Sequence, residues 1–332
     1  MQCMGCYKQV KEGYCLSCRK TMFAGLRTSP ILPFDAPKDE NLIYFQEHSK
    51  RLSISGVQLK YSLKLENKEL VLSERGGTYI LKPIPPYQQL AQIDQVPENE
   101  HLTMQIAKQV FNIPTAENVL IYFKDGTSAY LTKRFDLAAD GTKYLQEDFA
   151  QISGKTSRTH GDNFKYEGSY EDIGKLIQQY VPASIPACER LFTLVVFNYV
   201  FSNGDAHLKN FSLIRNAVGE YQLSPAYDLL STVIHNPAES DTALQLYDGD
   251  FDSAFYSKYG YYGRANFLEL AKRISILPKR AERILKQFIS KQSNVVEMVN
   301  NSFLRENVKA DYLKNFSEKL LRIGGVGLPD SC

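Results

Sequence analysis

Residues 202–213 read Ser-Asn-Gly-Asp-Ala-His-Leu-Lys-Asn-Phe-Ser-Leu, and the rest of the chain is interpreted outward from them. They follow an apolar segment, Leu191 to Phe201, which predicts a buried helix. Asp205 and Asn210 stand five residues apart. A tight loop can present both, so that a carboxylate takes the proton of an attacking hydroxyl while an amide oxygen holds Mg²⁺. The stretch therefore predicts a polar site at the end of a buried helix.

A second carboxylate follows this loop. Residues 211–214 and 221–223 flank a polar turn and predict a short hairpin, after which Asp228 appears. Protein kinases space a base and a metal-binding Asn in this way and keep their principal Mg²⁺ ligand after such a hairpin. Asp and Asn also cap turns very often, so Asp205 and Asn210 alone are weak evidence. The ordered triplet favours phosphoryl transfer.

From Gly56 to Lys82 the chain alternates apolar and polar residues as β-strands do. Leu102, Ile106 and Val110 are spaced four apart and predict one helix, and Asp125-Gly126 predicts a hairpin turn. The predicted strands are residues 59–65, 69–73, 78–82, 119–123 and 128–133. The first half of the chain is expected to be an α+β lobe.

The second half has mainly helical patterns, with Pro186 in the first turn of the buried helix. Helices are predicted over residues 170–180, 186–201, 265–274, 278–289 and 310–323. The predicted fold class is α+β, with a small sheet-rich lobe, a mostly helical lobe and a ligand cleft between them.

A kinase also needs a cation on the phosphates. Lys82 ends a predicted strand, and Glu100 lies in the first turn of the next helix, where it could pair with Lys82. Glu98 could take the place of Glu100. Glu147 and Phe149 lie between the two lobes, where a hinge would hold adenine, although composition alone decides little there.

The composition excludes several classes of protein. The 332 residues include 43% hydrophobic and 23% charged residues, as in folded globular proteins, and the formal charge is +2, so no bulk attraction to nucleic acid is expected. No apolar stretch approaches the roughly 20 residues of a membrane span, and the N-terminus lacks the pattern of a signal peptide. We expect a cytoplasmic protein with no membrane partner.

Four of the six cysteines form two C-x-x-C pairs near the N-terminus: Cys3, Cys6, Cys15 and Cys18. Four thiolates on two such turns are typical of a structural zinc site. A redox pair, an iron–sulfur centre and a chance cluster are the alternatives. Pro30, Pro33 and Pro37 then predict an extended connector.

Two features exclude an ordinary protein kinase: the glycine-rich G-x-G-x-x-G loop is absent, and Leu229-Leu230 stands where Phe-Gly is expected. The chain instead resembles the HipA-like serine/threonine kinase toxins of bacterial toxin–antitoxin systems. The resemblance runs from about Leu52 to Thr232. Its motifs, in order, are residues 53–58, 79–83, 98–100, 133–136, 146–149, 203–213 and 225–228.

The resemblance implies a role for each matching residue. Asp205 is the catalytic base, Lys82 contacts the ATP phosphates, and Ser53 and Ser55 are serines that the kinase phosphorylates on itself, which shuts off ATP binding. Added phosphate charge there would repel ATP. The other implied site residues are Asn210 and Asp228 as Mg²⁺ ligands, Glu100 as partner of Lys82, Glu147 and Phe149 at adenine, Gly56, Val57 and Gln58 in the phosphate loop, and His207 and Lys209 in the catalytic loop.

The expected organisation is a zinc knuckle over residues 1–25, a linker over 26–48, a kinase N-lobe over 49–146 and a C-lobe over 147–332. Full-length family members begin with a further subdomain, so this chain resembles the short HipT-like form. That form implies a small HipS-like partner and a helix-turn-helix antitoxin from the same operon, with DNA contacted only through the antitoxin. The family's targets are often aminoacyl-tRNA synthetases, but no residue here identifies one.

Two other functions fit parts of the sequence. A small-molecule phosphotransferase would have the same two lobes, and phosphate transfer to aminoglycosides or sugars would identify it. A non-catalytic repressor or DNA-binding module would use the cysteine knuckle. Lys8, Lys11, Arg19 and Lys20 are too few for strong phosphate binding, and every catalytic position is filled, which favours the kinase.

Overall fold

The computed structural model describes residues 1–38, 59–85, 90–138 and 140–325. The chain forms two compact units. The first consists of Met1–Gln105, Ala116–Lys143 and Glu297–Lys309, and the second of Ile106–Thr115, Tyr144–Val296 and Ala310–Cys332. The predicted domain ranges do not include two features of this division. The short segments Ile106–Thr115 and Glu297–Lys309 each belong to a different unit from the residues on either side of them.

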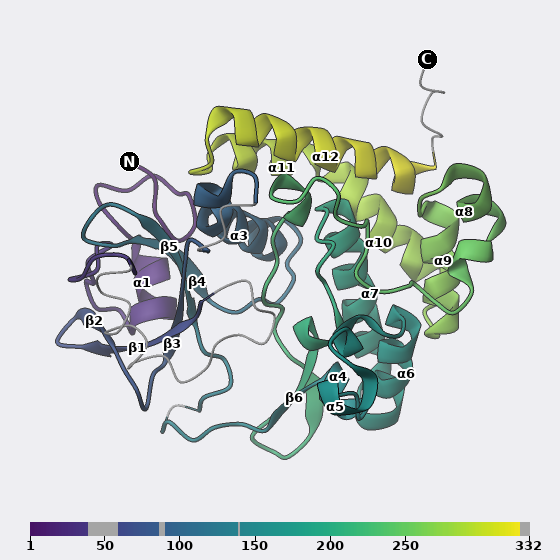
Figure 1. Cartoon of the computed structure of the whole chain (residues 1–332), viewed down its shortest axis with the longest axis horizontal. Helices are drawn as coiled ribbons and strands as arrows, with labels where there is room; N and C mark the ends of the chain where they lie inside the picture. The colour runs from purple at the N-terminus through teal and green to yellow at the C-terminus, as the bar shows by residue number, and fades with distance from the viewer. Residues whose placement is uncertain (39–58, 86–89, 139, 326–332) are drawn as a thin grey trace. The chain divides into compact units, whose positions relative to one another are not determined.

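The first unit is built on a five-stranded antiparallel sheet (Figure 1). Its strands are β1 (Tyr61–Glu66), β2 (Glu69–Leu72), β3 (Tyr79–Pro83), β4 (Asn118–Tyr122) and β5 (Ser128–Lys133), in the spatial order β2-β1-β3-β5-β4. Each predicted strand is confirmed to within two residues. Asn67 and Lys68 both have positive φ angles, as a two-residue hairpin turn between right-twisted strands requires.

The principal helix of this unit is α3 (Val96–Gln105), which packs against β4 and β5. It continues into a π-helical turn, Ile106–Val110, which belongs to the second unit. The predicted apolar stripe describes only part of the helix, since every residue of α3 is buried. Its polar residues must therefore find partners inside the protein.

The N-terminal residues are also part of the first unit, and they include helix α1 (Leu16–Phe23). Cys3, Met22 and Phe23 share one hydrophobic core with the sheet. The N–H group of Leu32 donates to the carbonyl of Tyr122 at 2.8 Å, so the expected linker runs along the outer edge of β4. Edge strands carry open peptide groups, and covering them explains why this segment packs here. The knuckle and the described part of the linker are thus not separate from the lobe.

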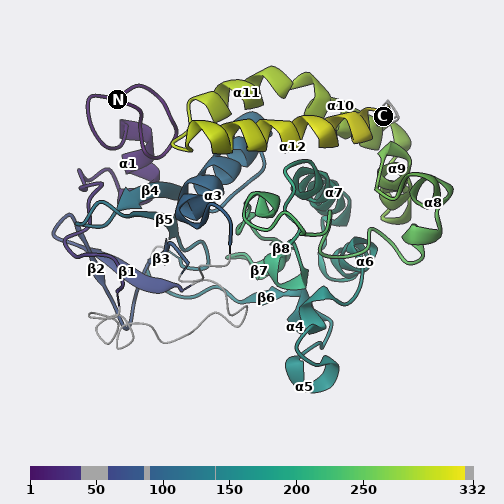
Figure 2. The same ribbon diagram turned by 45° about the horizontal axis from the view of Figure 1, so that its top comes forward.

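The second unit combines helices with a three-stranded antiparallel sheet of β6 (Gln146–Asp148), β7 (Ser212–Arg215) and β8 (Tyr221–Leu223) (Figure 2). The predicted helices are confirmed, and α7 is buried along most of its length, as its apolar sequence predicts. The helices that lie in or enter this unit are α4 (Phe149–Ile152), α5 (Ser157–His160), α6 (Tyr170–Tyr180), α7 (Ser184–Val200), α8 (Ala254–Tyr259), α9 (Arg264–Arg273), α10 (Pro278–Ser290), α11 (Gln292–Asn300) and α12 (Glu306–Gly324).

Across the described ranges, none of the helices combines the length and the apolar character needed to cross a bilayer.

Candidate functional site

The loop that follows α7 is fixed by hydrogen bonds to its backbone. Gly204 donates its N–H to the hydroxyl of Thr232 at 2.9 Å, and Tyr170 donates its hydroxyl to the carbonyl of Ala206 at 2.9 Å. A side chain at position 204 would lie 2.3 Å from the carbonyl oxygen of Ser240, so only glycine fits there. The loop therefore presents Asp205 on a rigid support.

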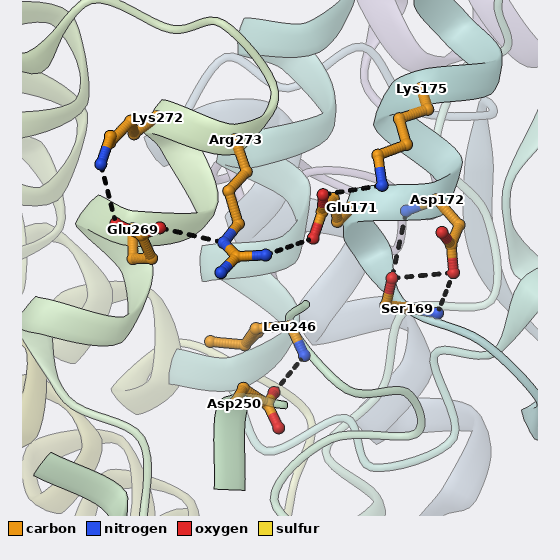
Figure 3. Close-up of polar contacts among 9 residues, drawn as sticks. All are labelled: Ser169, Glu171, Asp172, Lys175, Leu246, Asp250, Glu269, Lys272 and Arg273. Carbon is orange, nitrogen blue, oxygen red and sulfur yellow. Dashed lines mark hydrogen bonds and ion pairs between the residues drawn. The ribbon is translucent and has the colours of Figure 1, made fainter. Parts of the chain in front are cut away.

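The neighbours of Tyr170 in sequence, Ser169 and Glu171, make polar contacts at the start of a helix and with a second helix (Figure 3). Tyr170 is the first residue of α6, whose N-terminus is capped by Ser169. Glu171 accepts hydrogen bonds from Lys175 at 2.8 Å and from Arg273 of α9 at 3.2 Å. Figure 3 shows the Arg273 guanidinium between Glu171 and Glu269. These ion pairs join α6 to α9.

The Asp205 carboxylate is partly open to solvent, with 41% of the side chain exposed. Tyr166 donates its hydroxyl to Asp205 Oδ1 at 2.6 Å, the length of a charge-assisted hydrogen bond. His207 Nε2 lies 3.8 Å from the same oxygen. In the described chain, both polar contacts fall on Oδ1, which leaves Oδ2 available to an incoming hydroxyl. Burial and the hydrogen bond to Asp205 raise the pKa of Tyr166, so this tyrosine stays a donor.

His207 lies in this loop, where it was predicted to have a structural role. Its side chain is buried, and burial lowers its pKa to about 4, while the charges of Asp205 and Asp228 act in the opposite direction. The imidazole is therefore neutral at pH 7. Lys209 contributes a structural contact, because its carbonyl accepts the Tyr227 hydroxyl at 2.9 Å.

Asn210 has an unsatisfied oxygen. Its side-chain Oδ1 is buried and has no hydrogen-bond partner among the described residues, a state that costs free energy unless a ligand completes it. Asn203 holds the backbone of Asp228, donating to its carbonyl at 3.3 Å. Asp228 has a φ of 55°, in the left-handed region that non-glycine residues avoid. An amide oxygen and a carboxylate are the oxygen donors that Mg²⁺ prefers, so Asn210 and Asp228 fit this ion.

In the first unit, Lys82 of β3 and Glu100 of α3 form a buried ion pair. The Lys82 amine lies 2.5 Å from Glu100 Oε1, and the side chains are 4% and 1% exposed. Lys82 also lies over the ring of Tyr130, 5.3 Å from its centroid. The geometry thus selects Glu100 as the partner of Lys82.

Glu98 lies two residues before Glu100 on α3. It is also buried, but its environment is different. Its Oε2 has no hydrogen-bond partner among the described residues. Burial raises its pKa to about 7, above its usual value of 4.5.

Two side chains were predicted to contact adenine, and they differ in exposure. Glu147, on β6, is half-buried and accepts the Tyr221 hydroxyl at 3.5 Å. Phe149 is 0% exposed, since it begins α4 and its side chain turns into the core. A fully buried ring offers no face to a base, so the expected contact of Phe149 with adenine is not supported. The predicted phosphate-loop residues Ser53, Ser55, Gly56, Val57 and Gln58 lie outside the described residues.

The four predicted metal ligands converge. All Sγ atoms of Cys3, Cys6, Cys15 and Cys18 lie within 4.8 Å of one another, and Cys6 and Cys15 are 3.6 Å apart. A tetrahedron with Zn–S bonds of about 2.3 Å has edges of about 3.8 Å, which these sulfurs fit. The N–H group of Cys15 donates to Cys3 Sγ at 3.1 Å. Hydrogen bonds from the Cys18 and Cys6 thiols lower the pKa of Cys3 and favour its thiolate.

Sequence reasoning did not anticipate Tyr166, Tyr170 or Asn203 as parts of the site. Tyr166 lies 39 residues before Asp205 in a segment without hydrophobic periodicity, so no spacing pointed to it. Asn203 lies inside the loop that was singled out, and its position two residues before Asp205 was the available signal.

Comparison with known families gives a match over most of the chain. A model of the HipA-like C-terminal domain matches residues 52–296. A Haemophilus influenzae protein named as a candidate kinase is 28% identical over 319 residues, which cover 91% of this chain and 90% of that protein. A similarly named Sinorhizobium fredii protein is 33% identical over 229 residues, 64% of this chain and 53% of the relative.

The serine/threonine-protein kinase toxin HipA of Shewanella oneidensis is 26% identical over 252 residues, 70% of this chain and 56% of the toxin. The chain thus spans little more than half of this relative and of the Sinorhizobium protein.

Solved structures share the fold. Shewanella oneidensis HipA, solved with HipB and operator DNA, superposes with a TM-score of 0.63 at 21% identity, covering 89% of this chain and 74% of HipA. The Helicobacter pylori proinflammatory kinase CtkA gives 0.51 at 16% identity, covering 80% of this chain and 91% of CtkA. The predicted α+β, kinase-like fold is confirmed.

Proposed function

Because the chain belongs to the family of HipA-like C-terminal domains, we propose that it is an ATP- and Mg²⁺-dependent serine/threonine kinase that phosphorylates another protein. Its kinase-like character is common to its relatives. The observation that carries the proposal is the loop of the second unit, where Asp205 has one open carboxylate oxygen and Asn210 a buried oxygen without a partner.

The residues divide the reaction among them. Asp205 Oδ2 accepts the proton of the attacking hydroxyl, while Tyr166 keeps Oδ1 occupied. Asn210 and Asp228 would hold Mg²⁺, which would neutralise charge on the phosphates. Lys82, kept in place by Glu100, contacts the phosphates of ATP. Phosphoryl transfer needs little beyond such positioning and charge stabilisation.

Incubation with labelled ATP, Mg²⁺ and a bacterial lysate tests this proposal. The wild-type protein should label one or a few proteins, and Asp205→Asn should label none above background. Aminoglycosides and sugars serve as competing acceptors in parallel reactions. Label that enters these small molecules and no protein would replace the proposal with a small-molecule phosphotransferase.

We also propose that the kinase is regulated at Ser53 and Ser55. This proposal rests on their position before Gly56 in the sequence, where about −1.5 to −2 of added charge would repel the ATP phosphates. Purified protein should carry phosphate at one of the two serines, and Ser53→Asp or Ser55→Asp should weaken ATP binding. Mass spectrometry that finds both unmodified after long incubation with ATP, with unchanged ATP affinity of both variants, would remove this regulation.

The cysteine cluster is proposed to hold one structural zinc ion per chain. Four thiolates saturate a tetrahedral ion and leave no position for catalysis. Metal analysis of the purified protein should find about one zinc per chain, and Cys3→Ser combined with Cys6→Ser should abolish it. Zinc retained by that double variant would refute the assignment.

The partners follow from the family. Shewanella HipA was solved with HipB and operator DNA, which supports an antitoxin as a partner of this chain. We propose that this antitoxin is a helix-turn-helix protein and that DNA is contacted only through it. The other proposed partners are a protein substrate, for which an aminoacyl-tRNA synthetase is a candidate, and a small HipS-like protein. We place the protein in the cytoplasm. Expression of the whole operon, followed by identification of the proteins that co-purify with this chain, tests the two proposed operon partners.

A further inference from the structure

The cysteine knuckle, residues 1–25, packs tightly onto the sheet of the first unit. A Cβ atom at Gly5 would lie 2.7 Å from Cys18 Sγ and 3.1 Å from the Val119 side chain, so the chain passes directly between the sulfur cluster and β4. The Leu120 N–H group donates to the carbonyl of Met4 at 2.8 Å. The position of the knuckle is therefore set by the cluster on one side and the sheet on the other.

The knuckle contacts the strand that carries Lys82. Tyr79, three residues before Lys82 on β3, donates its hydroxyl to the carbonyl of Met22 at 2.6 Å. The Tyr79 ring also packs against Phe23, with ring centroids 6.0 Å apart. Both knuckle residues belong to α1, which begins between the last two cysteines.

The knuckle also contacts the helix that carries Glu100. Tyr7 follows Cys6 directly, and its hydroxyl is hydrogen bonded to Nδ1 of His101 at 2.8 Å. His101 is the next residue after Glu100 and is 0% exposed. The two rings meet edge to face, with centroids 5.1 Å apart. Tyr7 has a φ of 63°, a conformation that tyrosine adopts only when its surroundings impose it.

We infer that the metal-loaded knuckle is a brace for the Lys82–Glu100 ion pair, so that loading of the four cysteines controls how tightly the protein binds Mg²⁺–ATP. A metal ion bound to Cys6 would hold the backbone that positions Tyr7, and Tyr7 in turn positions α3 through its hydrogen bond to His101. Met22 and Phe23 position β3 in the same way. This inference rests on the proposed kinase function, because it assigns Lys82 to the phosphates of ATP.

Two tyrosine variants separate a brace from general stabilisation. Tyr7→Phe removes the hydroxyl that reaches His101 and leaves the ring and all four cysteines. Tyr14→Phe is the matched control, because Tyr14 is also a buried knuckle residue whose hydroxyl donates to the sheet, at 2.9 Å, but to Leu120 of β4. Strand β4 carries neither Lys82 nor Glu100.

The measurement is the affinity of each protein for a fluorescent ATP analogue with Mg²⁺, together with zinc content and thermal unfolding. We expect Tyr7→Phe to keep its zinc and to bind the analogue about fivefold more weakly, the effect of one hydrogen bond of about 1 kcal/mol. Tyr14→Phe should bind it as the wild type does. Removal of zinc with a chelator should weaken binding at least as much as Tyr7→Phe.

Equal affinities of the two tyrosine variants, or zinc removal without loss of affinity, would overturn the brace while leaving the kinase proposal intact. A zinc-loaded wild-type protein that neither binds the analogue nor transfers phosphate would overturn both. Measurable binding by wild type, retained by Tyr14→Phe and weakened in Tyr7→Phe, supports both.

Discussion

The molecule has two polar centres, which differ in whether their polar groups have partners within the protein. We call the Lys82–Glu100 pair the closed centre and the loop of Asp205 and Asn210 the open centre. In the first unit, Lys82 and Glu100 are almost completely buried and satisfy each other's charge. In the second unit, the Asp205 side chain is 41% exposed, and the Asn210 oxygen is buried without a partner. The first centre has its charges paired in the folded chain, whereas the second keeps an open carboxylate oxygen and a buried amide oxygen without a partner among the described residues.

The difference has a physical reason. A lone charge in a protein interior is very costly, so a buried lysine needs its carboxylate at all times, bound ATP or not. A base that must receive a proton from an incoming group needs an open oxygen. We therefore expect changes at the first centre to alter folding and changes at the second to alter chemistry.

The largest expected effect is that of Asp205→Asn at the open centre. An amide cannot accept the proton, so kcat should fall by about 10³-fold while the unfolding midpoint in urea stays that of the wild type. Asp162→Asn, at an exposed aspartate of the same unit, is the control and should be fully active. Substantial unfolding of Asp205→Asn would mean that the loop is structural and would erase the contrast.

At the closed centre, Glu100→Ala should lower the free energy of unfolding by about 3–5 kcal/mol, because it leaves the Lys82 charge buried and unpaired. Lys82→Met combined with Glu100→Met removes both charges and should recover most of that stability without recovering ATP binding. Urea titrations and nucleotide binding on the same samples measure both effects. A double variant as unstable as the single one would show that the charges are not what couples the two residues.

Glu98 sharpens the comparison, because it is a buried carboxyl of the first unit whose Oε2 lacks a described hydrogen-bond partner. Burial raises its pKa to about 7 in the folded protein against 4.5 as the ordinary value, so folding favours the protonated form. Its contribution to stability is complete below pH 4.5 and is lost as the pH rises through 7. Between pH 5 and pH 8 the loss should be about 2 kcal/mol.

Urea unfolding at several pH values should reveal this loss as a difference in slope between the wild type and Glu98→Gln, whose amide does not titrate. His207, with its lowered pKa, changes stability in the opposite direction, and it does so in both proteins. The exposed Glu69→Gln is the control and should leave the slope unchanged. A difference in stability between the wild type and Glu98→Gln that stays constant from pH 5 to pH 8 would mean that Glu98 ionises freely.

The smallest expected effect is that of Tyr166→Phe at the open centre. Loss of its hydrogen bond lets the Asp205 carboxylate rotate, so kcat should fall about tenfold, the equivalent of about 1.4 kcal/mol. The KM for ATP should not change. Tyr180→Phe, an exposed tyrosine on α6, should have no effect. In an Asp205→Asn background the Tyr166 substitution should cost little, and a full tenfold loss there would show that Tyr166 acts elsewhere.

Periodicity predicted most of the architecture. Strand β1 was found because alternate residues are buried, which leaves an alternation in the sequence, whereas β4 and β5 are buried on both faces and were found as short apolar runs on either side of the Asp125-Gly126 turn. Helix α3 was located from three apolar positions, but its burial on all sides was not, since it also buries polar residues against groups distant in sequence, such as His101 against Tyr7.

The candidate site was predictable where its residues are close together in sequence. Asp205 and Asn210 share one loop, and Asp228 follows one hairpin later, so spacing alone was enough to propose them together. The choice between Glu98 and Glu100 depends on how α3 is rotated about its axis relative to β3, and spacing in the sequence does not determine that rotation. Contacts such as Tyr7 with His101, or Tyr166 with Asp205, join distant segments, and only the folded chain brings them together.

The left-handed backbone of Asp228 has an evolutionary consequence. An aspartate in that conformation is less stable by about 1–2 kcal/mol than a residue without a Cβ atom would be. Selection for a more stable backbone would therefore favour glycine at this position, and a requirement for the carboxylate would oppose it. We expect descendants of this gene that have lost their activity but still fold to change at this residue early, gaining heat resistance as they lose the enzyme.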